Sequence, residues 1–188
     1  MDYFLLKQDE EYTNAPVLRD VFKEIDVRNI NLLNAHKIDD IVIFNVKCTD
    51  ETEFLDILDR NLFLISEKMK KIIEKYDPGI LFKTIPLIDL AHGRQENYYM
   101  PIFEEIECLS ENAELNLKKA VVKKIILDKE KIKNKKIFKI KESSKTLVVV
   151  RLDVAESLLR REFKGMCLER LEVEVEDTIK NVKLENRR

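Results

Sequence analysis

The segment LFLISEKMKKIIEKYDPGILFKTIPL, residues 62–87, carries the clearest structural signals in the chain. Ser66 is a favourable N-cap for a helix that begins at Glu67, where a carboxylate lies near the positive end of the helix dipole. One apolar face results from the helical spacing of four residues, Met69, Ile72, Ile73 and Tyr76. Because Pro78-Gly79 ends the helix and apolar residues lie on both sides of it, the segment predicts a strand, a helix and a second strand.

A second segment, VVVRLDVAESLLRREFKGMCLERLEV at residues 148–173, aligns with the first when a single gap is allowed. Asp153 then matches Ser66 as the helix cap, and Gly165 matches Gly79 as the helix stop. The second helix is predicted over residues 154–163. The alignment predicts an internal strand–helix–strand repeat, although two such segments can also match by chance.

Strand signals outnumber helix signals in the rest of the chain. β-branched and aromatic residues predict strands at residues 3–7, 41–47, 121–127, 137–141 and 146–152. A strand is also predicted where Leu and Val alternate with Glu at residues 171–176. The polar stretch 91–97, which contains Gly93, predicts a hairpin between residues 81–90 and 98–109.

We therefore expect an α+β fold, a mostly antiparallel sheet with two short helices, whose strand–helix–strand repeat forms two lobes. Residues 1–176 are expected to be a single domain with lobes of about 1–110 and 111–176. Residues 177–188 are expected to be a polar C-terminal tail.

Composition argues against several classes of protein. The chain has 188 residues, no apolar run near the ~20 residues of a membrane span, and an acidic N-terminus unlike a secretory signal. Its three cysteines, Cys48, Cys108 and Cys167, lie too far apart for a zinc module and are expected to be reduced thiols. Its three glycines are too scattered for a phosphate-binding loop. We expect a cytoplasmic protein without a membrane segment, a metal or a cofactor.

The two histidines do not form a recognisable catalytic motif. His36 precedes Asp39 and Asp40, and His92 follows Asp89, but no serine or cysteine nucleophile stands in a recognisable elbow beside either histidine. We expect no catalytic residues and no enzyme. A hydrolase that uses His36 with Asp39 or Asp40 is the distant alternative.

Charge is strongly segregated along the chain. Residues 98–117 contain five acidic residues and no basic one: Glu104, Glu105, Glu107, Glu111 and Glu114. A cluster of this kind can be a solvated face. It can also be a negative patch that steers a basic partner and selects against wrong ones. These five glutamates are the candidate partner-binding site.

Residues 118–145 have the opposite charge, with twelve lysines and three acidic residues. A nucleic-acid-binding module is the alternative function that this segment suggests. The segment lacks arginine, the better bidentate reader of phosphate, and its one aromatic residue is Phe138, which leaves no ladder for base stacking. Lysine-rich strand edges and turns that oppose aggregation are the simpler interpretation.

Three segments resemble immunity protein family 11 of the bacterial polymorphic-toxin systems. They are DYFLLKQDEEYTNAP at residues 2–16, DILDRNLFLISEKMKKIIEKYDPGILFKTIPL at residues 56–87, and RLDVAESLLRREFKGMCLERLEV at residues 151–173. The resemblance lies in hydrophobic patterns with caps and stops, and it extends from residue 2 to about residue 175.

Members of that family are found beside toxin genes. The resemblance implies a protein without catalysis that neutralises a cognate toxin by direct binding. It supplies no toxin-contact residues for this chain. If the toxin is a cationic nuclease, the five glutamates are the expected steering patch. The toxin's identity and the oligomeric state are left open by the sequence.

Overall fold

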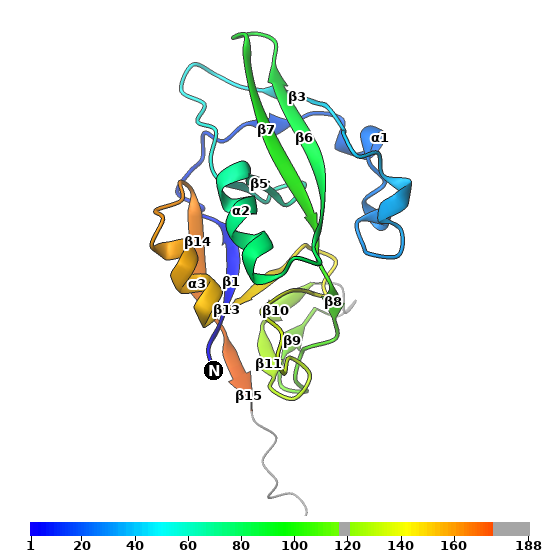
Figure 1. Cartoon of the computed structure of the whole chain (residues 1–188), viewed down its shortest axis with the longest axis vertical. Coiled ribbons are helices and arrows are strands. Elements are labelled where there is room, and N and C mark those ends of the chain that lie inside the picture. The colour runs from blue at the N-terminus through cyan, green and yellow to red at the C-terminus, as the bar shows by residue number, and fades with distance from the viewer. Residues whose placement is uncertain (117–120, 175–188) are drawn as a thin grey trace, which may run out of the picture.

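The computed structural model describes residues 1–116 and 121–174 (Figure 1). It is an α+β fold with two main sheets, mostly antiparallel strands, and few, short helices, as the sequence predicts. Among the residues described, no helix is long and apolar enough to cross a lipid bilayer.

Two sheets hold most of the strands. The five-stranded sheet has the order β14 (Met166–Arg170), β1 (Tyr3–Gln8), β13 (Val148–Arg151), β12 (Ile137–Ile140) and β8 (Glu105–Ile106). The six-stranded sheet has the order β2 (Val17–Leu18), β3 (Phe44–Lys47), β6 (Leu81–Asp89), β7 (Arg94–Ile102), β5 (Leu64–Ser66) and β4 (Ile57–Leu58). Two further pairs are β9 (Glu114–Leu115) with β10 (Val122–Lys124), and β11 (Ile126–Asp128) with β15 (Glu172–Glu174).

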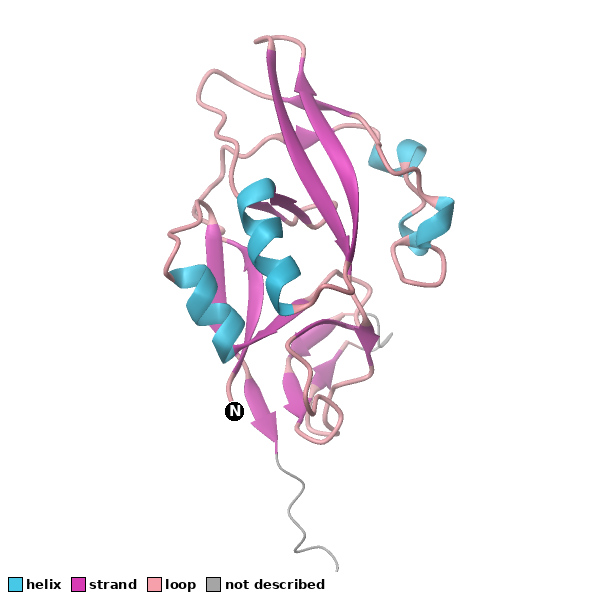
Figure 2. Ribbon diagram, in the orientation of Figure 1, coloured by secondary structure: helices cyan, strands magenta, loops and turns pink. Residues whose placement is uncertain are grey.

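Two helices, α2 (Glu67–Tyr76) and α3 (Leu152–Leu159), are the ones that the sequence predicts. They contact each other and lie on the same side of the sheets in Figure 2. The one-turn helix α1 (Val21–Glu24) and the 3-10 turns η1 (Val27–Asn29) and η2 (Ala35–Lys37) were not predicted.

The predicted repeat is present in the order of the strands. β5 and β6 flank β7 and run antiparallel to it, and α2 connects them. β13 and β14 flank β1 in the same way, and α3 connects them. Because β4 pairs with β5 as β12 pairs with β13, the orders β6-β7-β5-β4 and β14-β1-β13-β12 correspond.

The central strand of the two units has a different origin. β7 follows β6 directly in the chain, whereas β1 comes from the N-terminus. The five-stranded sheet therefore takes strands from both sides of the lobe boundary expected near residue 110. That residues 1–176 form a single domain stays a prediction, and the tail from residue 177 lies outside the described residues.

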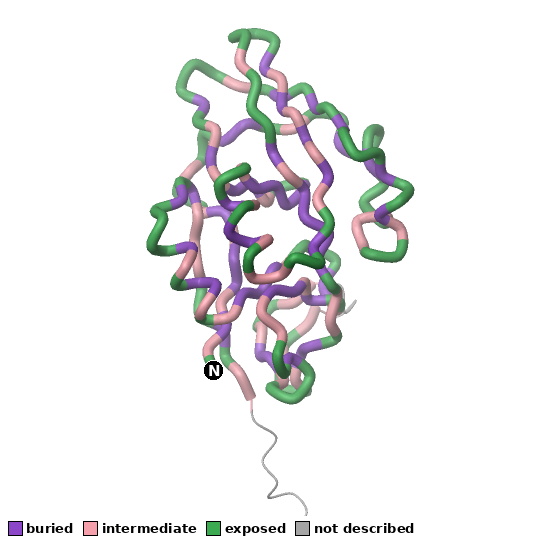
Figure 3. Tube along the Cα trace, viewed as in Figure 1, coloured by how far each residue is buried: buried purple, intermediate pink, exposed green. Residues whose placement is uncertain are grey.

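A shared apolar core joins the two units. Met69 and Ile73 of α2 are fully buried in one cluster with Val150 of β13 and Val154 and Leu158 of α3. Figure 3 shows this buried interior between the exposed outer turns of both helices. Since full burial of one large aliphatic side chain stabilises a fold by about 1.5–3 kcal/mol, this cluster contributes strongly to holding the units together.

The helix boundaries agree with the sequence at α2 and differ at α3. Ser66 Oγ accepts a hydrogen bond from Met69 N at 3.3 Å, so Ser66 is the cap as predicted. At α3 the N-cap is Arg151, and Asp153 lies in the first turn. The backbone N–H of Leu152 donates to Asp2 O at 3.0 Å, which leaves one donor fewer for a capping side chain. Asp153 instead accepts from the Arg151 guanidinium at 2.7 and 2.8 Å.

The observed bounds of the β6–β7 hairpin and of β3 also differ from the predicted ones. β6 and β7 are joined by residues 90–93, a shorter turn than the predicted 91–97, because Gly93 takes a left-handed φ of 63° and Arg94 already pairs with Asp89. β3 begins at Phe44, three residues later than predicted.

We predict that Gly165→Ala destabilises the chain more than Gly93→Ala does. Both glycines have positive φ, but a Cβ at Gly165 would lie 2.7 Å from Leu55 Cδ1, whereas nothing lies within 4 Å at Gly93. We expect a loss of about 1 kcal/mol at Gly93 from backbone strain alone, and of roughly 2–4 kcal/mol at Gly165. Urea unfolding of both variants measures the difference, and equal losses would contradict the close approach to Leu55.

Candidate functional site

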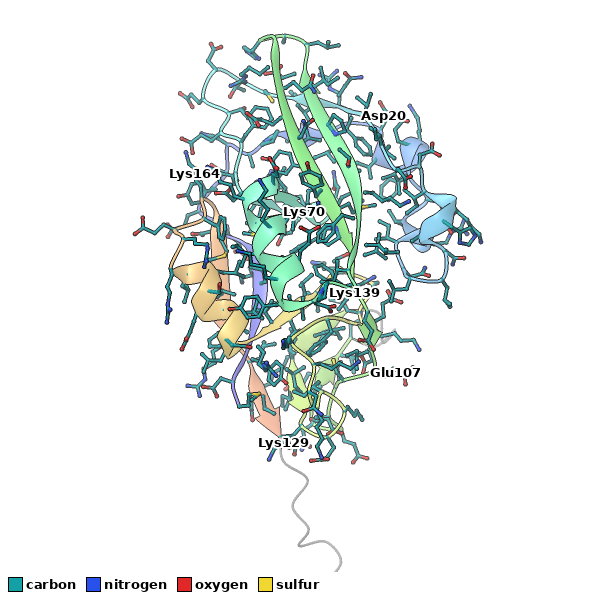
Figure 4. All side chains as sticks on the ribbon, in the orientation of Figure 1. Asp20, Lys70, Glu107, Lys129, Lys139 and Lys164 are labelled. Carbon is teal, nitrogen blue, oxygen red and sulfur yellow. The ribbon has the colours of Figure 1, made fainter. Side chains whose placement is uncertain are left out.

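The first three predicted glutamates lie in β8 or beside it, and they face lysines in β12 or beside it. The two strands run parallel, with Glu105 opposite Lys139. This register brings three carboxylates within 2.6–2.7 Å of three lysine Nζ atoms, in the pairs Glu104–Lys135, Glu105–Lys139 and Glu107–Lys141. Figure 4 shows Glu107 and Lys139 in this part of the molecule.

These ion pairs change the electrostatics of the acidic run. A hydrogen bond and the positive charge of Lys141 lower the pKa of the Glu107 carboxyl, and Glu107 in turn raises the pKa of Lys141. A cation beside each carboxylate cancels most of its field at a distance. Among the described residues, the β8 glutamates therefore present a row of neutralised pairs.

Glu111 and Glu114 lie apart from that row. Glu111 is in an exposed turn, and Glu114 begins β9, where it is also exposed. Within residues 1–116 and 121–174, neither has an ion pair. The structure thus brings Glu104, Glu105 and Glu107 together, whereas Glu111 and Glu114 lie outside that row, with Glu114 opposite Lys124 in the β9–β10 pair. Whether any of the five contacts a partner stays a prediction.

The lysine-rich segment loses part of its positive field in the same way. Besides the three pairs with β8, there are pairs with nearby acids: Lys124–Glu172, Lys131–Asp128 and Lys133–Glu130, at 3.0, 3.4 and 4.0 Å. Lys136 lies over the Tyr76 ring at 6.0 Å. Lys118 and Lys119 are outside the described residues. This arrangement weakens the support for a phosphate-binding face.

His92 belongs to a polar network around the buried Asp89 carboxylate at the tip of the β6–β7 hairpin. Its Nδ1 lies 2.8 Å from Asp89 Oδ2, and Arg94 donates to the same oxygen at 2.7 and 2.9 Å. Burial alone would raise the pKa of the Asp89 carboxyl, but the hydrogen bonds from His92 and Arg94 outweigh it and lower the pKa to about 2. Arg94 also donates to the carbonyls of Thr49 and Thr52, at 3.0 and 3.2 Å.

This network fastens the hairpin tip to the loop after β3. The Arg94 guanidinium lies 5.6 Å from the Phe54 ring centroid, and His92 Nε2 lies 3.2 Å from Asp50 Oδ1. These contacts give His92 and Asp89 a structural role. The Asp89 side chain is 1% exposed, and its carboxylate oxygens accept hydrogen bonds from protein donors.

His36 is exposed in η2 and stands apart from its neighbouring acids. Asp40 pairs with Lys83 Nζ at 2.8 Å, and in the described chain no hydrogen bond joins His36 to Asp39 or Asp40. A surface cavity of about 810 Å³ between the N-terminus, residues 129–134 and β15 is lined by neither histidine. No group of three or more His, Cys, Asp or Glu in the described part of the chain could hold a metal ion.

The surface also has exposed apolar side chains, which the charge pattern of the sequence does not indicate. Phe22 and Leu33, in the segment that contains α1 and η2, are among the most exposed large apolar side chains of the described chain. The sequence indicates this exposure only weakly. The apolar residues of segment 21–38 do not recur at one regular helical or strand spacing, so they cannot all lie on one buried face.

We predict that Asp89→Asn reduces the loss of stability on acidification. The pKa of Asp89 falls from 3.8 to about 2 on folding, so its contribution to stability is present above pH 3.8 and is lost as the pH falls towards 2. Part of the acid sensitivity should remain in the variant, because a hydrogen bond from Arg28 also lowers the pKa of Asp26 to about 2. Urea unfolding between pH 2 and 5 measures the slope, with the exposed Glu51→Gln as control. A slope unchanged in Asp89→Asn would contradict the network.

Comparison with known proteins gives one family. The family model described as the immunity protein family Imm11 matches residues 37–173. This range includes helices α2 and α3, which connect the strands of the two units, and the ion-paired β8 and β12. Among curated proteins, no sequence similar to this chain is found. Because the family model covers well over half of the chain, this protein belongs to the immunity protein family Imm11.

Proposed function

We propose that this chain neutralises one cognate toxin by binding it directly, without catalytic turnover, in the cytoplasm. Membership of the Imm11 family over residues 37–173 is the observation that carries the proposal, since that family implies toxin neutralisation. Neutralisation by binding needs a stable interface of about 800 Å² on each partner with a few buried anchor residues. It needs no residues that move protons or bind metals.

The structure supports a rigid binding scaffold. The two units share one apolar core, and the hairpin tip is fastened by the network around Asp89. A preorganised surface loses little conformational entropy when it binds, which favours high affinity. The nucleic-acid alternative has less support because half of the twelve lysines of residues 118–145 lie in ion pairs with acids of this chain.

We predict that the chain forms a stable complex with the toxin domain encoded by the gene beside its own. Co-expression should restore growth, and the two proteins should co-elute in size-exclusion chromatography with a Kd of about 1 nM or below. Growth restored without any complex would contradict neutralisation by binding. Tight binding to generic DNA that falls steeply with salt would favour the nucleic-acid module instead.

The toxin is proposed to be basic. Glu111 and Glu114, which have no ion pair with any other described residue, are proposed to speed its capture. The double variant Glu111→Lys/Glu114→Lys should lower the association rate constant by about 2- to 10-fold at low salt and reduce its salt dependence, with little change in dissociation. Stopped-flow mixing measures both rates. The exposed Glu162→Lys, beyond α3, is the control for net charge. An association rate equal to that of the control rules out steering by Glu111 and Glu114.

A further inference from the structure

One of the strands that end the two main sheets is longer than the others. The end strands β2, β4 and β8 have two residues each, whereas β14 has five. Folded proteins keep the edges of their sheets short, or interrupt them with proline, lysine or a bulge, because a regular edge is a template for another strand. β14 contains neither proline nor lysine, and its register with β1 runs without a bulge. The outer side of β14 is therefore a regular edge, which we call the β14 edge.

The hydrogen bonds at both ends of β14 show which of its residues bond to β1. In an antiparallel pair, residues that exchange backbone hydrogen bonds alternate with residues that do not. Before β14, the N–H of Asp9 donates to Gly165 O at 2.9 Å, and after it the N–H of Leu171 donates to Tyr3 O at 2.9 Å. Because the register of β14 with β1 is regular, its odd-numbered residues bond to β1.

The even-numbered residues of β14 direct their backbone groups away from β1. They are Met166, Leu168 and Arg170. Within the described part of the chain, the N–H and C=O groups of these three residues have no hydrogen-bond partner. The β14 edge thus presents three donors and three acceptors to any strand that approaches it.

The internal repeat shows what such an edge can hold. β14 corresponds to β6 of the other unit, because each strand follows the helix of its unit and flanks the central strand. On the side of β6 away from β7 lies β3, which is parallel to β6. The residues before β3 continue this pairing, since Val42 N donates to Thr84 O at 3.0 Å and Thr84 N donates to Asp40 O at 2.8 Å.

At β14, no strand of the described chain takes the place that corresponds to β3. Figure 2 shows β14 beside β1 at the left of the molecule, with no described strand beyond it. The two units therefore differ at this position: one carries a parallel strand on its outer side, and the other leaves the same side open.

The side chains of β14 suit an added strand. Met166 and Leu168 pack, half-buried, against the core cluster that α2 and α3 share, so part of their apolar surface stays exposed. The charged side chains of β14 are already paired within this chain, as Lys7–Glu169 and Asp2–Arg170, at 2.9 and 3.0 Å. A strand added to the β14 edge covers further apolar surface and meets charges that already have partners.

The direction of the added strand separates two kinds of occupant. Two copies of this chain in a closed dimer are related by a two-fold axis, which brings identical edges together antiparallel. A strand that runs parallel to β14, as β3 does to β6, fits a different protein instead. The proposed function supplies one such partner, the cognate toxin.

We propose that the cognate toxin adds an extended segment to the β14 edge, parallel to β14, in the place that β3 takes beside β6. Main-chain hydrogen bonds to Met166, Leu168 and Arg170 supply affinity, and apolar side chains at alternate positions of the toxin segment supply specificity. This inference rests on the proposed function, that the chain neutralises a toxin by binding. It adds where the toxin binds and in which geometry.

Amide hydrogen exchange, followed by NMR, tests the inference in the unmodified chain. In the free chain, the N–H groups of Met166, Leu168 and Arg170 should exchange fast, whereas those of Cys167 and Glu169, which bond to β1, should exchange slowly. Saturation with the toxin domain of the neighbouring gene should slow the first three by at least about 10-fold. If these three amides are already slow in the free chain, another part of the chain or a second copy covers the β14 edge, and the inference is wrong.

A pair of substitutions at one residue tests the contribution of the edge to affinity. Arg170→Pro removes an outward N–H and places the proline ring on the β14 edge, but it removes no hydrogen bond to β1. It should weaken the Kd for the toxin domain by about 10- to 100-fold, chiefly through faster dissociation.

Arg170→Ala is the matched control, because it removes the same side chain and the ion pair with Asp2 but keeps the N–H. It should change the Kd less than about threefold. Urea midpoints check that both variants fold, and the exchange experiment needs no variant. Equal affinities of the two folded variants would overturn the inference.

Each result separates this inference from the proposed function. If the unmodified chain binds the toxin while the three outward amides exchange as in the free chain, the toxin binds elsewhere and neutralisation by binding stands. If the unmodified chain does not bind the toxin, both fail. Analytical ultracentrifugation covers a second copy as occupant. A dimer that Arg170→Pro dissociates without loss of toxin affinity contradicts a toxin strand at this edge.

Discussion

Helices α2 and α3 bury their apolar faces in one core, and the arrangement of both sheets depends on that contact. Each helix is the connection of one strand–helix–strand unit, so side chains such as Ile73 and Leu158 hold their own unit and the other unit at once. The turn after α3 adds a second junction, where Lys164 N donates to Asp56 Oδ2 and the Gly165 backbone packs against Leu55. With the units joined, the surfaces outside the core are held in fixed positions.

Charge in this chain is organised by strand pairing. The acidic residues before residue 115 and the lysines from residue 118 onward form separate blocks in the sequence, but parallel pairing of β8 with β12 places three residues of each block side by side. Exposed pairs of this kind contribute only about 0–1 kcal/mol each to stability. Their larger effect is on the external field, because opposite charges 2.7 Å apart attract a distant partner much less than either block alone would.

A surface with neutralised charge recognises partners mainly by shape and apolar contact. Around α1, the pairs Lys23–Asp20 and Arg28–Asp26 neutralise part of the charge, and Phe22 and Leu33 expose large apolar side chains. The family match begins at the end of η2 and ends within β15, so that β1, β2, α1 and η1 precede it.

The sequence alone predicted the features that depend on neighbouring residues. The start of α2 at Glu67 followed from the Ser66 cap, its buried face from the spacing of Met69, Ile72 and Ile73, and the repeat from a match of caps, faces and stops. It also predicted the α+β class and the resemblance to the immunity protein family.

Three features could not be read in this way: that β1 fills the centre of the second unit, that Glu105 meets Lys139, and that Phe22 and Leu33 remain outside the core. Caps and periodicity act over a few residues, so they can be recognised locally. The partner of a strand or a charge is chosen by which apolar faces can be buried together. This choice joins residues that are far apart in the sequence, such as Phe4 and Arg170, which are 166 positions apart and lie opposite each other on neighbouring strands.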